Sequence, residues 1–149
     1  MISVDTNILV YAAAQDGDAR NAEAEQLVSQ LFLLPATVPV QVLAEFLNVT
    51  GRKNPAAIAQ SLERVEEWLA LFDVAPTMPA DLIAAQRLRA RYKMQFFDAL
   101  ICAVALRSGA RILLSEDLQN GMSIDGLTVL NPFAIANRDA IGALFGASE

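Results

Sequence analysis

Five short, mostly apolar runs alternate with longer stretches of helical periodicity along this chain. The runs are residues 2–4, 36–38, 72–74, 111–114 and 127–130. Each is bounded by polar residues, Gly or Pro within a few positions and is too short for a regular helix, as is typical of a buried strand. The pattern therefore predicts five β-strands.

Apolar residues that recur every three to four positions predict helices between these strands. The predicted helices cover residues 7–14, 19–33, 39–49, 55–71, 80–93, 95–107 and 134–145. Pro35 ends the second helix, and Pro39 suits the first turn of the third. Gly51 is expected to end the third helix and Gly109 to cap the sixth. Strands that alternate with helices predict an α/β fold with a parallel sheet covered on both faces.

Composition narrows the class of protein further. A chain of 149 residues is expected to form one domain, residues 1–149, and 54% hydrophobic against 19% charged residues argues against disorder. No apolar run reaches the roughly 20 residues that cross a membrane, and no signal-peptide pattern opens the chain. The single cysteine, Cys102, lies in an apolar run and is expected to be an inert core residue. These features fit a cytoplasmic protein.

The absence of histidine from the sequence excludes several kinds of site. Ser-His-Asp and Cys-His mechanisms and the usual zinc sites all need an imidazole. Acid–base or metal chemistry in this chain must therefore rest on carboxylates, and oxygen-only sites suit Mg²⁺ or Mn²⁺. The net charge of −6 argues against a general nucleic-acid coat but allows a local basic strip.

Four acidic residues stand at positions where a site can form. Asp5 directly follows the first predicted strand, and Asp117 follows the fourth by three residues. Both should lie at the carboxyl edge of the sheet, where open α/β sheets bind ligands. Asp98 begins an apolar helix, and Glu45 lies within another. Simpler roles also fit each residue: helix capping for Asp5 and Asp98, an exposed polar stripe for Glu45 and loop polarity for Asp117.

Carboxylates that lie close together repel one another and tend to hold protons. A divalent cation relieves that repulsion, and Mg²⁺ needs only a few carboxylates because it keeps several waters. Such a site can activate a water as a nucleophile and stabilise charge on a phosphoryl oxygen. The four carboxylates thus predict a phosphoryl-hydrolysing metal centre.

Four segments in order resemble the PIN-domain ribonucleases, and among them the VapC toxins of bacterial toxin–antitoxin pairs. The resemblance rests on VDTNIL at 4–9, VLAEF at 42–46, FDALI at 97–101 and LSEDLQNG at 114–121, with LNPF at 130–133 closing the match. It implies a three-layer α/β/α sandwich with a five-stranded parallel sheet. It also implies endonucleolytic cleavage of RNA with Mg²⁺ or Mn²⁺, an antitoxin partner and a homodimer.

The resemblance also assigns roles to individual residues. Metal binding and catalysis would belong to the four carboxylates Asp5, Glu45, Asp98 and Asp117. Supporting positions would be held by Asn7, Ser115 and Glu116. Family members often carry Thr where this chain has Ser115, which keeps the hydroxyl.

The surfaces that would bind RNA and the antitoxin are less sharply marked. Basic residues precede Asp98 and are interleaved with aromatic ones: Arg87, Arg89, Arg91 and Lys93 with Tyr92, Phe96 and Phe97. They predict either a phosphate-binding strip or an ordinary solvated helix face. Arg52 and Lys53 are a weaker candidate. The helix at 56–71, rich in large apolar residues, is either core or a groove for an antitoxin helix. The mean hydropathy of +0.36 also favours a homodimer.

Two other kinds of enzyme or signalling domain place an Asp at a strand end, and this sequence lacks their motifs. A covalent phosphatase of the haloacid dehalogenase type would carry a second Asp at position 7, which is Asn7, and a receiver domain would carry an acidic pair and a late Lys that are missing here. A PIN-like scaffold that binds RNA or protein without nuclease activity remains the alternative. All four acidic positions are filled, which favours the enzyme.

Overall fold

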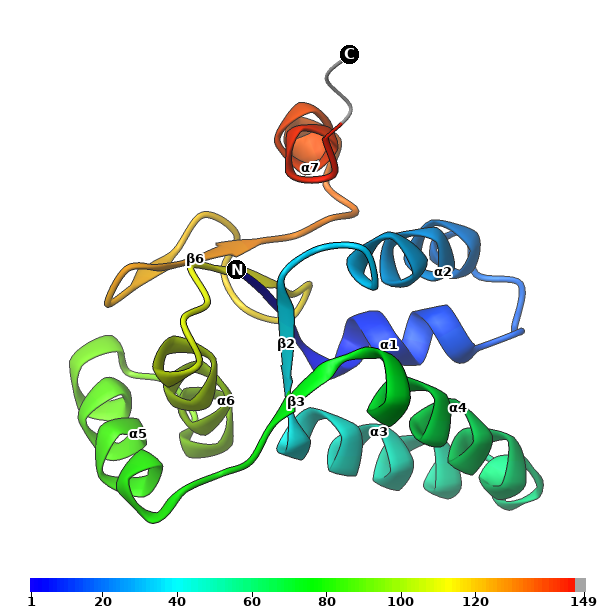
Figure 1. Ribbon diagram of the computed structural model, residues 1–149, viewed down its shortest axis with the longest axis horizontal. Coiled ribbons are helices and arrows are strands. Elements are labelled where there is room, and N and C mark those ends of the chain that lie inside the picture. The colour runs from blue at the N-terminus through cyan, green and yellow to red at the C-terminus, as the bar shows by residue number, and fades with distance from the viewer. Residues whose placement is uncertain (147–149) are drawn as a thin grey trace.

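The computed structural model of the protein describes residues 1–146, and residues 147–149 of the expected domain lie outside the described part. Helices and strands alternate in the predicted order (Figure 1). The strands are β1 (Ile2–Val4), β2 (Ala36–Pro39), β3 (Asp73–Ala75), β4 (Ile112–Leu114), β5 (Ser123–Ile124) and β6 (Leu127–Leu130). The helices are α1 (Thr6–Ala13), α2 (Arg20–Leu31), α3 (Val40–Lys53), α4 (Ile58–Leu71), α5 (Pro79–Tyr92), α6 (Phe96–Arg107) and α7 (Arg138–Leu144), with short 3₁₀ turns at Pro55–Ala57 and Ile135–Asn137.

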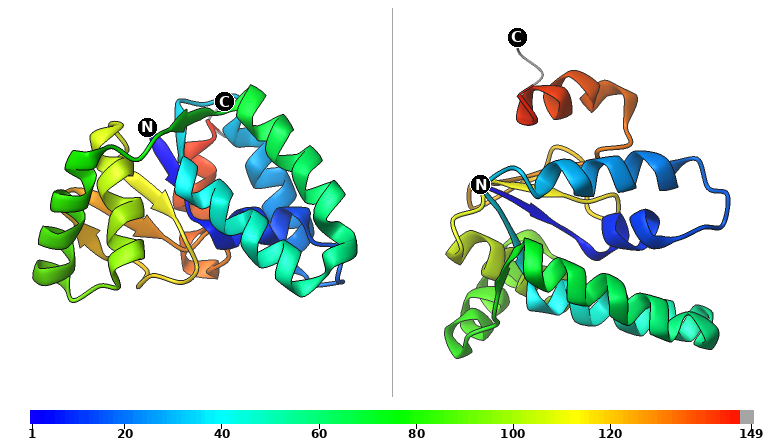
Figure 2. Two further views of the ribbon diagram at one scale, coloured as in Figure 1. Left: turned by 90° about the horizontal axis from the view of Figure 1, so that it is seen from below. Right: turned by 45° about the vertical axis from the view of Figure 1, so that its right-hand side comes forward.

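The strands form one sheet in the order β3-β2-β1-β4-β6-β5. All neighbours run parallel except β5 and β6. In Figures 1 and 2, α2 and α7 lie on one side of the sheet, and α3, α4, α5 and α6 on the other. The three-layer α/β/α sandwich is confirmed, and so are the five predicted parallel strands.

Two details differ from the sequence-based expectation. The sixth strand, β5, was not predicted; it pairs with β6 through a two-residue turn in which Asp125 and Gly126 have φ of 48° and 93°. Both residues suit the left-handed conformations that tight hairpins need. The expected end of α3 at Gly51 was wrong, since the helix continues to Lys53. One helical glycine costs only about 1 kcal/mol, and the helix stops where Asn54 precedes Pro55.

The core lies between the sheet and both helical layers. Val4, Leu113 and Leu114 of the central strands are at most 1% exposed, and residues 99–105 of α6 are all buried, including Cys102. Phe46 and Trp68 join α3 to α4 with their ring centroids 4.8 Å apart. Across residues 1–146, the helices include none with the length and apolarity that a membrane span requires.

Candidate active site

Asp5 is the most buried of the four predicted acidic residues. It ends β1 and caps α1, and its carboxylate accepts hydrogen bonds from Thr6 N (2.7 Å), Ser115 Oγ (2.8 Å) and Asn7 Nδ2 (3.3 Å). The side chain is only 6% exposed. Burial raises the pKa of Asp5 to about 6, and the charges of Asp98 and Asp117 add to the rise, although the bonds from Ser115 and Thr6 oppose it. Asp5 is therefore held in place by hydrogen bonds, but its ionised form is less favourable in the folded protein than in water.

Strand pairing brings the Asp117 loop next to Asp5. β1 and β4 are parallel neighbours with Val4 opposite Leu114, so Asp5 and Ser115 leave the sheet side by side. The Asp5 N–H donates to Leu114 O at 2.9 Å. Ser115 Oγ in turn accepts from the N–H groups of Asp117 (3.2 Å) and Leu118 (3.3 Å). One serine hydroxyl thus connects the Asp5 carboxylate to the backbone at Asp117.

Glu45 approaches the same edge from α3. Its carboxylate accepts from Thr6 Oγ1 at 2.8 Å on one oxygen and from Gln41 Nε2 at 2.9 Å on the other. Gln41 Nε2 also donates to Phe97 O at 3.1 Å, immediately before Asp98. Thr6 and Gln41 therefore orient Glu45 between the start of α1 and the start of α6.

Asp98 lies in the first turn of α6 and is half-buried. Its pKa is raised, first by burial and then by the charges of Glu45 and Asp117. Within residues 1–146 its carboxylate accepts no hydrogen bond, and neither does that of Asp117. None of the ion pairs of the described residues involves any of the four carboxylates. The four are thus mutually repelling acids with no protein cation to balance them.

This arrangement fits an oxygen-liganded divalent cation. In the described part of the chain, no three Asp, Glu or Cys side chains are close enough to enclose a metal as they stand. Asp5 and Glu45 are held by protein donors, whereas the carboxylates of Asp98 and Asp117 accept no hydrogen bond from the part of the chain that the structure describes and can turn toward a cation. An all-oxygen donor set suits Mg²⁺ or Mn²⁺, and a bound cation would relieve the burial and repulsion that raise the pKa values of Asp5 and Asp98.

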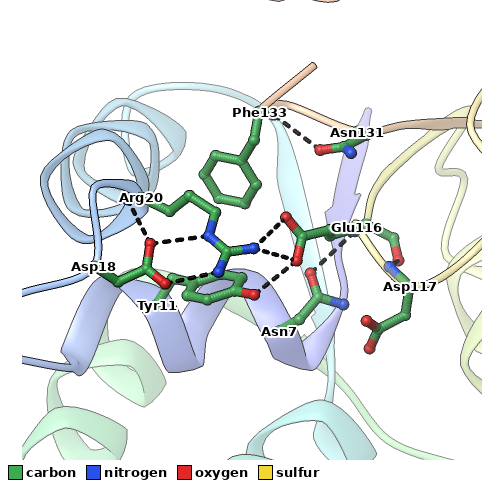
Figure 3. A network of polar contacts seen from close by, with 9 residues as sticks. Asn7, Tyr11, Asp18, Arg20, Glu116, Asp117, Asn131 and Phe133 are labelled. Atoms are coloured by element: carbon green, nitrogen blue, oxygen red, sulfur yellow. Dashed lines mark hydrogen bonds and ion pairs between the residues drawn. The ribbon is translucent and has the colours of Figure 1, made fainter. Parts of the chain in front are cut away.

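The supporting residues Asn7 and Glu116 lie beside the acidic cluster. Asn7 bridges it, because Nδ2 donates to Asp5 and Oδ1 accepts from Glu116 N at 3.1 Å. The Glu116 carboxylate points elsewhere: it accepts from Tyr11 OH (2.6 Å) and from Arg20 Nη1 (2.8 and 2.9 Å) (Figure 3). The structure therefore places Glu116 in an ion pair rather than among the four acids.

The predicted basic strip of Arg87, Arg89, Arg91 and Lys93 is exposed, but Arg91 already forms an ion pair. Arg91 Nη1 pairs with Asp125 at 2.7 Å, and Tyr92 OH donates to the same oxygen at 2.7 Å. The side chains of the other three members are exposed: Arg87, Arg89 and Lys93.

The helix at 56–71 has a buried face, which confirms its core role, and an exposed face; the groove for an antitoxin helix stays a prediction. Val65, Trp68 and Phe72 are core residues, whereas Leu62 and Leu69 are about half exposed. A groove of about 740 Å³ runs between α1, α3 and α4, and polar side chains make up much of its lining.

Four residues that contact the site were not predicted as functional: Thr6, Tyr11, Arg20 and Gln41. Only Gln41 carried a sequence signal, because it lies one helical turn before Glu45. The partners of the others are far away in the chain.

Comparison with known proteins is consistent with this geometry. The family profile described as PIN domain matches residues 2–119. Ribonuclease VapC7 of Mycobacterium tuberculosis is 29% identical over 120 residues, which cover 78% of this chain and 82% of that protein.

Two solved structures have a similar fold. One is M. tuberculosis VapC20, described as a Sarcin-Ricin loop cleaving toxin, with 23% identity, a TM-score of 0.62 and coverage of 78% of this chain and 92% of that one. The other is a toxin–antitoxin complex from Klebsiella pneumoniae, with 22% identity, a TM-score of 0.64 and coverage of 91% and 100%.

Proposed function

Because the chain belongs to the PIN-domain family, we propose that it is a metal-dependent endoribonuclease and the toxin of a toxin–antitoxin pair. The observation that carries the proposal is the meeting of Asp5, Glu45, Asp98 and Asp117 at one sheet edge, where charge repulsion contributes to raising the pKa values of Asp5 and Asp98. The relative named Ribonuclease VapC7 supports the choice of RNA as substrate.

The four carboxylates would hold Mg²⁺ or Mn²⁺. A bound ion would stabilise charge on the phosphoryl oxygens and lower the pKa of water. The protein's own residues orient the carboxylates and accept a proton from water. Thr6, Gln41 and Ser115 hold Glu45 and Asp5 in place, and a carboxylate with a raised pKa is a suitable acceptor for the proton of the water that attacks phosphorus. The bond to the 3′ oxygen breaks, and that oxygen takes up a proton from the protonated carboxylate or from solvent, which leaves a 5′ phosphate and a 3′ hydroxyl.

Cleavage of a mixed RNA pool tests this proposal. We expect cuts with Mg²⁺ or Mn²⁺, none in excess chelator, and a loss of rate by orders of magnitude in Asp5→Asn and Asp98→Asn. Asp73→Asn, the same chemical change at an exposed position on β3, is the matched control and should cut at the wild-type rate. Binding of RNA or protein without metal-dependent cleavage would identify the chain as a scaffold and refute the proposal.

The exposed basic residues at the end of α5 are proposed to bind the RNA backbone. Arg89 lies in the last turn of α5 and Lys93 caps the helix shortly before α6 and Asp98, and Arg87 lies two residues before Arg89. Neutralising all three should raise KM, reduce the salt dependence of binding and leave kcat unchanged. An unchanged KM would show that this face is only solvated.

We also propose an antitoxin partner and a homodimer. The similarity to a toxin–antitoxin complex supports the first. Exposed apolar side chains support protein association in general, since Leu62, Leu69 and Ile83 are 50%, 53% and 61% exposed. An antitoxin arginine would suit the acidic edge, because a guanidinium matches carboxylates in geometry and charge. Co-expression with the neighbouring open reading frame, followed by purification of a stable complex, tests the pairing.

A further inference from the structure

Arg20, at the start of α2, ties three segments of the chain together. Its Nε and Nη2 donate to the two oxygens of Asp18 at 2.9 and 2.7 Å, while Nη1 contacts both oxygens of Glu116 at 2.8 and 2.9 Å. Its guanidinium carbon lies 4.2 Å from the centre of the Tyr11 ring (Figure 3). All three guanidinium nitrogens therefore donate to protein carboxylates.

Glu116 receives this cluster on the other side of the site. Arg20 and Tyr11 bind its carboxylate, and Asn7 accepts its backbone N–H. Phe133 packs edge-on against Tyr11, with 5.4 Å between ring centroids, so the hydroxyl that reaches Glu116 is itself supported. Contacts to Glu116 thus connect α1 and α2 to the loop that follows β4.

Asp117 is the next residue, and within residues 1–146 its carboxylate accepts no hydrogen bond. Its position therefore depends on its backbone: its own N–H donates to Ser115 Oγ, and the preceding residue, Glu116, is held by Asn7, Tyr11 and Arg20. In Figure 3 the two side chains leave the loop in different directions, with Glu116 toward Arg20. Without the guanidinium, the partly buried Glu116 carboxylate would keep the Tyr11 hydroxyl but lose its ion-pair partner next to the acidic edge, and repulsion and hydration would draw it out of place.

We propose that Arg20 is a positioning residue of the active site, which acts through Glu116 to hold Asp117 where a divalent cation needs it. The inference rests on the proposed function, because it assigns Asp117 to the metal. Outer residues that orient metal ligands typically change metal affinity or activity by about 10- to 100-fold when they are replaced. Arg20 acts on the proposed metal ligand Asp117 only through Glu116, so we expect a change in metal affinity and activity near tenfold.

The test compares Arg20→Met, Arg20→Lys, Glu116→Gln and Tyr11→Phe with wild type. In metal-free protein, hydrogen exchange should rise in the 115–121 loop of Arg20→Met and stay unchanged in β1 and α6. Mn²⁺ affinity and kcat should each fall about tenfold, while KM for RNA is unchanged. Arg20→Lys keeps the positive charge but not the planar guanidinium with its several donors, so it should lose less Mn²⁺ affinity and less kcat than Arg20→Met. The double variant Arg20→Met with Glu116→Gln should be no worse than the more affected single variant, because both act through one contact.

Arg107→Met is the matched control. Arg107 forms a comparable ion pair with buried Asp81, at 2.8 and 3.0 Å, at the far end of α6 from Asp98. It should lower stability without changing the 115–121 loop or Mn²⁺ affinity. If Arg20→Met does not fold, Glu116→Gln and Tyr11→Phe decide the matter by the same measurements.

The outcomes separate this inference from the proposed function. Wild-type Mn²⁺ affinity and loop exchange in the Arg20 variants, or in Glu116→Gln and Tyr11→Phe, would overturn the role of Arg20 and leave the nuclease proposal standing. A wild-type chain that neither binds Mn²⁺ nor cuts RNA would refute the proposed function, and the positioning role with it.

Discussion

The buried carboxylate of Asp5 should make the metal-free protein less stable at neutral pH than its Asn variant. Burial raises the folded-state pKa to about 6 from an ordinary value of 3.8. Because the folded state then holds the proton more tightly than the unfolded state, the penalty is absent below pH 4, grows between pH 4 and pH 6 and is constant above pH 6. One pKa unit corresponds to about 1.4 kcal/mol, so the full penalty is about 3 kcal/mol.

Urea unfolding of wild type and Asp5→Asn, in chelator from pH 4 to pH 8, measures this effect. The quantity of interest is the difference between the two free energies of unfolding, in which the titration of groups that do not interact with Asp5 cancels. An amide cannot accept from Thr6, Asn7 and Ser115 as a carboxylate does, so the difference carries a constant offset. Between pH 4 and pH 8 the difference should nevertheless change by about 2.5 kcal/mol in favour of Asn, because the carboxyl of the unfolded chain is already more than half ionised at pH 4.

Asp18→Asn is the control, because hydrogen bonds from Arg20 lower the pKa of Asp18 to about 2. A lowered pKa stabilises the folded state above the unfolded value of about 4, and this contribution is lost only as the pH falls toward 2. The Asp18 difference should therefore be nearly flat from pH 5 to pH 8. If the Asp5 difference is equally flat, burial does not penalise this charge and the electrostatic account of the site is wrong.

Three further outcomes follow from the same structure. Asp98→Asn should raise the stability of the metal-free protein by about 1 kcal/mol, because it removes a repelled charge that accepts no hydrogen bond within residues 1–146. Thermal melts in chelator measure this change. In the same melts, added Mn²⁺ should stabilise the wild type but not the variant. Trp68→Ala should lower the free energy of unfolding by about 3–5 kcal/mol, because the 1%-exposed indole packs on Phe46; a loss below 1 kcal/mol in urea would contradict the core assignment. Light scattering at micromolar concentration should give the mass of a dimer, and a monomeric mass would contradict it.

Local pattern was enough to predict most of the fold. Apolar runs and helical periodicity are short-range properties, and they located all five parallel strands and every helix. The weak points were also local: β5 has only two residues, too few for a period to appear, and Gly51 was given more weight as a helix stop than its cost of about 1 kcal/mol justifies. Parallel pairing then implied that Asp5 and Asp117 share an edge, which the neighbouring positions of β1 and β4 confirm.

The order of residues along the chain therefore defines the available chemistry, which is carboxylates without histidine, placed at strand ends and on apolar helices. The groups that hold these carboxylates follow from the packing of distant segments. Thr6 meets Glu45 across 39 positions, Arg20 meets Glu116 across 96 and Ser115 meets Asp5 across 110. Such partners depend on strand order and helix packing, which a one-dimensional pattern does not encode. For the same reason Asp5 could be recognised as acidic from its sequence position, but its pKa of about 6 follows only from its burial and neighbours.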